Sequence, residues 1–335
     1  MTGQQSVRSM QDQFGRKIDY LRISVTDKCN LRCTYCMPVE GLDWIDRDEF
    51  LTYEEIASVV RQMAGQGLRR LRLTGGEPLV RRDLPDLVHM LSVIPGIEDI
   101  AVSTNAILLP QFGRELLEAG VSRVNVSLDT LRRDRFRDVA RRPERFFDAT
   151  IDGIAVAERL GFAPLKINTV LMRNLNDDEI EDFADITRER PWHVRFIELM
   201  PTGDNLHLSK QFLSADSVVE RLRAIGDLRP ASGPVGNGPA TYFQFDGAPG
   251  TVGVITPLSH NYCDRCNRMR LTADGKLRTC LFGTHEVDLK TPLRATGDVL
   301  PAVRMALAGK PERHLLQLGT ARGSGGLRAL SQVGG

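Results

Sequence analysis

Residues 20–36 read Tyr20-Leu-Arg-Ile-Ser-Val-Thr-Asp-Lys-Cys29-Asn-Leu-Arg-Cys33-Thr-Tyr-Cys36, so a β-rich run leads directly into three closely spaced cysteines. A second group, Cys263, Cys266 and Cys280, lies near the C-terminal end, and the two groups contain all 6 cysteines of the chain. Each group is one thiolate short of the four that usually close a metal site. A four-iron cluster held by either group would therefore keep one iron free for another ligand.

Strand and helix patterns alternate from this run through the first two thirds of the chain. The predicted strands are 20–25, 71–74, 100–103, 124–127, 165–171 and 194–199, and the predicted helices are 52–63, 84–93, 112–118, 146–160, one starting near 176, and 214–224. Thr52, Asn176 and Ser214 have the spacing of helix N-caps. Six strand–helix units predict a parallel sheet covered by helices, and they are too few for a complete eight-unit barrel. Spacing alone leaves an open doubly wound sheet and a barrel as alternatives, and in both the ligands bind at the carboxyl ends of the strands.

The pattern changes after residue 226. Residues 230–239 are rich in turn formers, short strands are predicted at 242–245 and 252–255, Asp274-Gly275 predicts a hairpin, and a helix is predicted at 300–307. We therefore expect four parts: a disordered leader (1–17), the strand–helix domain (18–226), a C-terminal region with the second cysteine group (227–317), and a flexible glycine-rich tail (318–335) that ends in Gly334-Gly335.

Composition restricts the class of protein. The chain has 335 residues, 41% of them hydrophobic, and a formal net charge of +1, which argues against a nucleic-acid-binding protein that attracts polyanions over its whole surface. No apolar run approaches the roughly 18–20 residues that span a bilayer, and the polar N-terminus lacks a secretory signal. A cytoplasmic protein is expected, in which cysteines bind metal more often than they form disulfides.

Zinc is the alternative metal for both groups. The first group has no histidine nearby, and the closest one in sequence is His89. The second group resembles half of a zinc ribbon, for which His260 or His285 could supply the fourth ligand. Taken alone, the second group leaves zinc and an iron–sulfur cluster equally open.

Two motifs together resemble the radical S-adenosylmethionine (SAM) superfamily: the Cys29-x3-Cys33-x2-Cys36 spacing after the first strand, and Gly75-Gly76-Glu77-Pro78 after the second. The resemblance implies a partial (βα)6 TIM-type barrel in which the three cysteines hold a [4Fe–4S] cluster. Its open iron would bind SAM, which is cleaved reductively to a 5′-deoxyadenosyl radical. The implied SAM contacts are Tyr35, Gly76, Ser127 and Met200.

The second group and its surroundings, Asn261 to Thr272 and Asp274 to Cys280, resemble one branch of this superfamily. That branch cyclises GTP by removing the ribose C3′ hydrogen and joining C3′ to guanine C8, at the start of molybdenum cofactor biosynthesis. The resemblance implies a second [4Fe–4S] cluster at Cys263, Cys266 and Cys280 whose open iron binds guanine. The implied GTP contacts are Arg22, Arg72, Ser103, Lys166, Arg268, Met269 and Arg270.

Further roles follow from the same resemblance. Arg268, Arg270, the first three cysteines and the terminal Gly334-Gly335 would act in catalysis, and the product would pass to cyclic pyranopterin monophosphate synthase. The reductant is not identified, and either a monomer or a homodimer is expected. Ala106 stands where the family usually has glycine, and both Ser103 and Thr104 offer the hydroxyl that contacts GTP. The competing hypotheses are a radical peptide-modifying or sulfatase-maturing enzyme and a zinc-stabilised nucleic-acid-binding module.

Overall fold

The computed structural model describes residues 10–201, 203–236, 238–316 and 328–334. A single sheet with the strand order β12-β11-β10-β1-β2-β3-β4-β5-β6-β9-β8-β7 runs through these residues. Its centre is parallel and consists of β1 (Tyr20–Ser24), β2 (Arg70–Thr74), β3 (Asp99–Thr104), β4 (Arg123–Ser127), β5 (Lys166–Leu171) and β6 (His193–Glu198). The prediction of an open barrel of six strand–helix units is confirmed.

Both edges of the parallel sheet are extended by the C-terminal region. On one side β10 (Arg268–Leu271) runs parallel to β1 and continues into the antiparallel strands β11 (Lys276–Arg278) and β12 (Glu286–Asp288). On the other side β9 (Thr251–Ile255) runs parallel to β6, followed by β8 (Thr241–Phe245) and β7 (Leu228–Ala231). The predicted hairpin at Asp274-Gly275 joins β10 to β11. The boundary at 226/227 remains a prediction, since one sheet passes through both parts.

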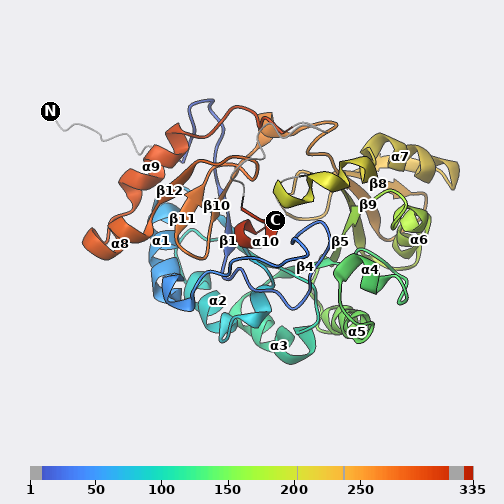
Figure 1. Cartoon of the computed structure of the whole chain (residues 1–335), viewed down its shortest axis with the longest axis horizontal. Coiled ribbons are helices and arrows are strands. Elements are labelled where there is room, and N and C mark those ends of the chain that lie inside the picture. Colours follow the sequence, from blue (N-terminus) through green and yellow to red (C-terminus); the bar gives the residue numbers. More distant parts are fainter. Residues whose placement is uncertain (1–9, 202, 237, 317–327, 335) are drawn as a thin grey trace.

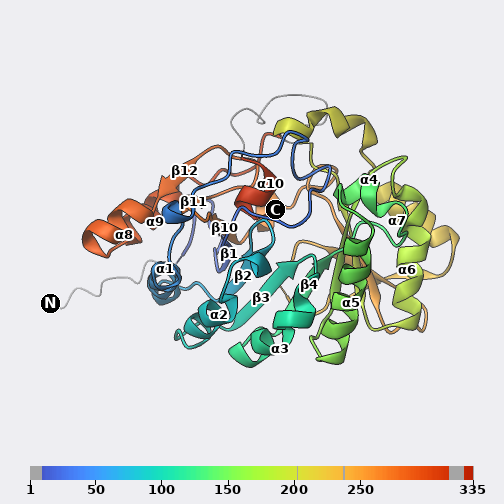
Figure 2. The same ribbon diagram turned by 60° about the horizontal axis from the view of Figure 1, so that its bottom comes forward.

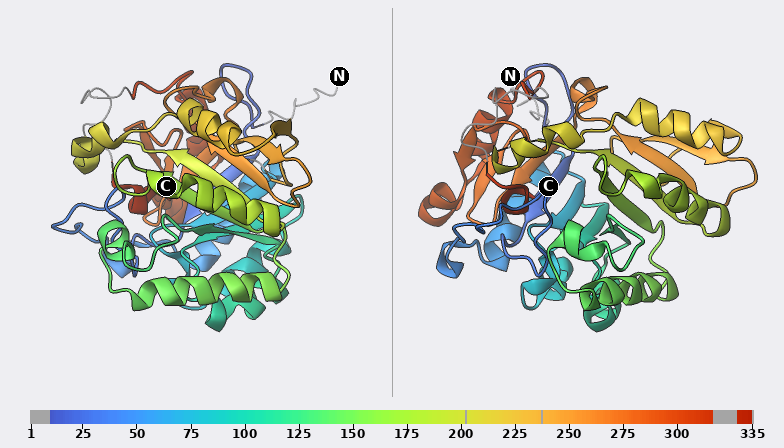
Figure 3. Two further views of the ribbon diagram at one scale, coloured as in Figure 1. Left: turned by 90° about the vertical axis from the view of Figure 1, so that its right-hand side faces the viewer. Right: turned by 45° about the vertical axis from the view of Figure 1, so that its right-hand side comes forward.

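Helices cover the outer face of the sheet (Figures 1 and 2). They are α1 (Tyr53–Gly65), α2 (Leu84–Ser92), α3 (Leu109–Ala119), α4 (Phe136–Ala140), α5 (Arg145–Arg159), α6 (Ile180–Glu189) and α7 (Ala215–Ala224). At one edge α8 (Lys290–Thr296) and α9 (Leu300–Ala308) lie beside α1, whereas the short α10 (Leu330–Val333) lies in the middle of the molecule (Figure 3). No helix of the described residues is long and apolar enough to cross a membrane.

The two faces of the sheet differ in chemistry because strand side chains alternate. The outward side chains are apolar and pack against the helices in one core; they include Leu21, Ile23, Leu71, Leu73, Val124, Val126, Ile167 and Val194. The inward side chains are polar or charged, and the register places Arg22 beside both Arg72 and Arg270. The same face carries Asn125 beside Lys166 and Asn168 beside Arg195. The inward face of the sheet, which surrounds the barrel lumen, is therefore polar, whereas the outward face forms the apolar core.

Two of the three helix N-caps predicted from the sequence are present in the structure. Thr52 and Glu55 form the predicted capping box, and Ser214 accepts a hydrogen bond from the Ser217 amide. The prediction for Asn176 is wrong: its buried amide binds the Met172 N–H and the Asp129 and Val170 carbonyls instead. Helix α6 consequently starts only at Ile180, after a 3-10 turn.

Both chain ends are more ordered than expected where the structure describes them. Met10 is buried, Gln11 pairs with Lys17, and Arg16 donates to the Cys263 carbonyl at 2.6 Å. At the other end Leu330, Ser331 and Val333 are buried. Residues 330–333 thus form a short helix with buried side chains, while the division into four parts, including the flexible tail, remains a prediction. Gly335 and residues 1–9 lie outside the described residues.

Candidate functional site

The first cysteine group lies in the loop that follows β1, at the carboxyl ends of the parallel strands. Cys29, Cys33 and Cys36 line a pocket together with loops after four other strands. The predicted contacts that line it with them are Tyr35, Gly76, Ser103, Ser127 and Met200. The structure therefore brings together every residue that the sequence assigned to SAM.

Gly75 and Gly76 allow this pocket to form because their backbone runs against the start of the cysteine loop. The Gly76 amide donates to the Thr26 carbonyl and the Glu77 amide to the Lys28 carbonyl, each at 2.8 Å. Gly75 has a φ of 145°, and a Cβ on either glycine would collide with backbone atoms of residues 26–28. Glycine is thus needed at both positions because the loop after β2 packs closely against the start of the cysteine loop.

Two buried acids border the first cysteine group. Glu77 accepts from the Thr104 hydroxyl and the Asn105 amide, both at 2.7 Å, and burial raises its pKa to about 7. Asp129 accepts from the Tyr35 hydroxyl at 2.9 Å, and burial raises its pKa to about 6. Asp129 therefore orients Tyr35, one of the predicted SAM contacts.

The second cysteine group lies at the opposite end of the same strands. Cys263 and Cys266 precede β10, which is parallel to β1, and Cys280 follows the antiparallel β11. Along the strand direction, the two cysteine groups are separated by the length of β1, which has 5 residues and is about 16 Å long. A pocket lined by these cysteines also contains Arg268 and Arg270.

The donor set of each group fits a four-iron cluster. All six cysteines are free, and within the described residues no three His, Cys, Asp or Glu side chains converge on a single metal ion. A cubane does not need such convergence, because each of its cysteines binds a different iron. Thiolate sulfur is also the ligand that iron–sulfur clusters require.

The two groups differ in the charge around their thiols. Burial raises the pKa of Cys29 and Cys36 to about 12, and burial with Asp129 raises that of Cys33 well above its usual value. Burial would also raise the pKa of Cys266, but the cations of Lys310 and Arg268 outweigh it and lower that pKa. Arg32 also lies near Cys29, but burial and Glu77 outweigh its charge there, whereas at Cys266 the neighbouring cations outweigh burial.

Cations occupy the lumen between the two groups. The sequence identified Arg22, Arg72, Lys166, Arg268 and Arg270, and the register places all of them on the inward face. The structure adds Arg123, which is paired with Asp99, and Arg195. Arg195 lies inside the predicted strand 194–199, and a charge among apolar strand residues is a signal by which it could have been found from sequence. The predicted fourth strand began at residue 124, which excluded Arg123.

Crowding and burial disfavour the charged form of these groups. Burial, followed by the charges of Arg195 and Arg123, lowers the pKa of Lys166 to about 6. Burial and Arg268 lower the pKa of Arg270 to about 10. Buried like charges repel one another unless an anion lies among them. The lumen is thus built to accept a polyanion.

Three further predicted positions can now be placed. The Ser103 hydroxyl faces the lumen and accepts from Arg72 at 3.4 Å, whereas Thr104 donates to Glu77. Met269 lies between two inward arginines, so its side chain points outward into the hydrophobic core, and a side-chain contact with GTP is ruled out by the strand alternation. Ala106 has a φ of 68°, so the turn that usually has glycine does need the left-handed conformation.

The end of the chain lies between the two cysteine pockets. Leu330 and Ser331 line the first pocket together with Cys36. The Val333 and Gly334 carbonyls accept from Arg270, which lines the second pocket. The last described residues therefore contact residues of both pockets.

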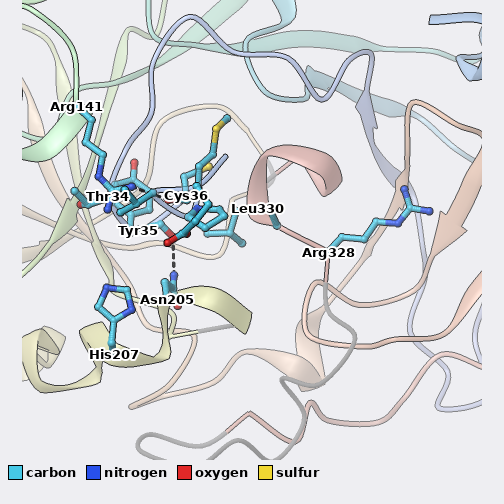
Figure 4. Close-up of a pocket in the computed structure, with 13 residues that line it drawn as sticks. Thr34, Tyr35, Cys36, Arg141, Asn205, His207, Arg328 and Leu330 are labelled. Carbon is cyan, nitrogen blue, oxygen red and sulfur yellow. Dashed lines mark hydrogen bonds between the residues drawn. The ribbon is translucent and has the colours of Figure 1, made fainter. Parts of the chain in front are cut away.

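An outer pocket lies on the far side of Cys36 and Leu330 (Figure 4). Its wall includes Arg141 and His207, and Asn205 donates to the Tyr35 carbonyl across it at 2.5 Å. Arg328 reaches away from it and forms a bidentate pair with Asp274. This ion pair anchors the segment that leads into the barrel.

The geometry and the comparisons with known proteins agree on the class of protein. The family described as the Radical SAM superfamily matches residues 23–186, and the family described as Molybdenum Cofactor Synthesis C matches residues 192–316. Among solved structures, Streptococcus suis SuiB bound to S-adenosylmethionine has a TM-score of 0.57 at 14% identity, covering 86% of this chain and 68% of that one. SuiB bound to its precursor peptide SuiA has a TM-score of 0.59, covering 79% and 60%. At this identity, both show the fold alone.

Curated relatives are far more similar. GTP 3′,8-cyclase of Pelotomaculum thermopropionicum is 48% identical over 331 residues, and that of Moorella thermoacetica is 46% identical over 329 residues. Each match covers 97% of this chain and 100% of the relative. The chain belongs to the GTP 3′,8-cyclase family of radical SAM enzymes. Its cofactors are accordingly SAM and two [4Fe–4S] clusters, one at each cysteine group.

Proposed function

We propose that this protein is a GTP 3′,8-cyclase that catalyses the first step of molybdenum cofactor biosynthesis. In this reaction the C3′ hydrogen of the GTP ribose is removed and C3′ bonds to C8 of guanine. The observation that carries the proposal is the cation-lined lumen between two cysteine groups, since a nucleoside triphosphate has both the length and the charge to occupy it. Full-length relatives of the same name support it.

The first pocket holds and orients SAM. Cys29, Cys33 and Cys36 would hold the cluster that supplies an electron for the cleavage of SAM, and the second group would hold the cluster that offers an iron to guanine. Asp129 holds Tyr35 at the wall of this pocket, which Gly76, Ser127 and Met200 complete. Burial of this pocket keeps water away from a reactive radical.

The lumen binds the triphosphate. Arginine suits phosphate because its planar fork donates two parallel hydrogen bonds. Arg22, Arg72, Arg270 and Lys166, with Arg195 and Arg123, surround the path between the pockets, and Ser103 adds a hydroxyl. Charge compensation by GTP would relieve the mutual repulsion of these groups. Binding of GTP should therefore stabilise the arrangement of these cations in the centre of the barrel.

The chain end positions the reacting groups. Arg270 donates to the Val333 and Gly334 carbonyls, and Ser331 lines the first pocket. We propose that this segment shifts when GTP enters and that Gly334, followed by Gly335, contacts the substrate. Reduced thiols and a polar surface favour a cytoplasmic enzyme, which passes its product to cyclic pyranopterin monophosphate synthase and works as a monomer or homodimer.

The deciding experiment is anaerobic incubation with GTP, SAM and dithionite, followed by mass analysis of nucleotide and nucleoside products. The proposal expects 5′-deoxyadenosine together with a cyclised nucleotide of unchanged mass relative to GTP, and about eight irons per chain. Zinc in place of iron would contradict it and favour a zinc-stabilised module. Cleavage of SAM with no change to GTP at full iron content would instead favour a radical enzyme with another substrate.

A further inference from the structure

Lys310 is a buried cation that directly follows α9 and belongs to none of the motifs above. Its exposed fraction is 2%. Its ammonium group makes three contacts: 2.6 Å to the Thr279 carbonyl, 3.1 Å to the Arg268 carbonyl and 3.5 Å to the Cys266 sulfur. An ammonium has three donors, so these contacts satisfy all of them. The three acceptors come from the segments that hold the second cysteine group.

The charge of Lys310 needs an anion as well as hydrogen bonds. A buried ammonium without a counter-ion is strongly disfavoured. Among the described residues no carboxylate forms an ion pair with Lys310, although most other buried or half-buried cations outside the lumen have one. The sulfur of Cys266 is the remaining anionic partner. Lys310 thus fits a site whose cysteines are held as thiolates.

The first cysteine group has more acidic surroundings. The buried acids Glu77 and Asp129 line its pocket, and the nearby cation Arg32 donates to the Cys29 carbonyl. No lysine lines its pocket within the described residues. Adding an electron to a cluster adds negative charge, which a fixed cation in contact favours and a nearby acid opposes.

We propose that Lys310 is a positioning residue whose fixed charge raises the reduction potential of the second cluster above that of the first. The inference rests on the second cluster of the proposed function, but not on the identity of the substrate. The two clusters would then have different roles. The first cluster remains the stronger reductant, which suits it to cleaving SAM. The second cluster keeps its electron and serves as a ligand-binding site.

The test is a redox titration, followed by electron paramagnetic resonance, of protein without SAM or GTP. To isolate the second cluster, Cys29, Cys33 and Cys36 are replaced by alanine; to isolate the first, Cys263, Cys266 and Cys280 are replaced. Lys310→Met removes the charge and keeps the length of the side chain, whereas Lys310→Arg keeps the charge. Iron content is measured first, so that a failure of the second cluster itself is seen separately.

We expect Lys310→Met to lower the midpoint potential of the second cluster at full iron content, with Lys310→Arg close to the parent. The first cluster, measured in its own background, should keep its potential in Lys310→Met. An unchanged second-cluster potential in Lys310→Met would overturn the proposal, as would an equal shift in Lys310→Arg. If Lys310→Met loses iron, Lys310→Gln replaces it. Loss of iron there too, with Lys310→Arg loaded, would overturn tuning in favour of a role in cluster assembly.

Discussion

The two ends of the barrel carry the same metal ligands, but the balance of charge around them differs. At the carboxyl ends of the strands three cysteines lie with the buried acids Glu77 and Asp129, and at the amino ends three cysteines lie with Lys310, Arg268 and Arg270. The comparison shows that the cysteine spacing determines which cofactor binds. The charged side chains around the cysteines determine which role that cofactor has in the reaction. An acidic end suits electron release, and a cationic end suits an anionic substrate.

The largest effects are expected when one cluster-binding cysteine is removed from each group. These variants test which cluster cleaves SAM and which binds GTP. Cys33→Ala should abolish SAM cleavage, because the first cluster loses a ligand. Cys266→Ala should abolish GTP cyclisation and leave some uncoupled SAM cleavage. Chromatography of 5′-deoxyadenosine and of the nucleotide product measures both. Normal cyclisation by the Cys266→Ala protein would refute the assignment of GTP to the second end.

Arg195 tests the cationic lumen with a residue that the sequence reading did not select. Arg195→Met should weaken GTP binding roughly tenfold to a hundredfold, because a charged hydrogen-bond donor is lost. Ligand-free protein should become more stable, by about 1 kcal/mol in the free energy of unfolding, because a crowded buried cation is removed. Anaerobic calorimetry and denaturant titration measure the two effects.

The matched control is Arg229→Met, which removes an exposed arginine paired with Asp227. It should change neither the GTP affinity nor, beyond about 0.5 kcal/mol, the stability. A loss of stability in Arg195→Met would show that the arginine is structural and that the lumen is not poised for an anion.

Lys166 should make GTP binding depend on pH. Its pKa of about 6 in the free protein leaves it mostly neutral at pH 7.5, and a bound triphosphate favours the protonated form. Binding should therefore take up a proton, and the affinity should rise as pH falls from 8.5 to 7, at most about tenfold per pH unit. Calorimetry in buffers of different ionisation enthalpy measures this uptake. The Lys166→Met protein should lack it, and equal uptake by both proteins would contradict the prediction.

The smallest effect is expected on stability, from a substitution of Ala106 in the turn that follows β3. Its φ of 68° is costly for alanine and free for glycine, so Ala106→Gly should raise the free energy of unfolding by about 0.5–1 kcal/mol. Ala119→Gly, at the last residue of α3, should instead lower it, by at most about 1 kcal/mol, the cost inside a helix. Thermal unfolding of both variants decides the point, and destabilisation by Ala106→Gly would show that the turn is not strained.

The sequence by itself determined the cofactor chemistry and the order of the elements. Cysteine spacing, the Gly75-Gly76 turn and six apolar strand runs depend on residues close together in the chain, where local geometry leaves few alternatives. It also placed Thr52 and Ser214 correctly, because capping is a local interaction, and it misplaced Asn176, whose amide bonds are set by packing with Asp129.

Only the tertiary structure decided what lies between the two cysteine groups. Sheet register brings Arg22, Arg72 and Arg270 side by side from distant parts of the chain, and the burial of α10 places Gly334 beside Arg270. Lys310 becomes a neighbour of Cys266 through the packing of α9 against the edge strands. Charges and contacts of this kind depend on distance in space, which no local pattern of residues records.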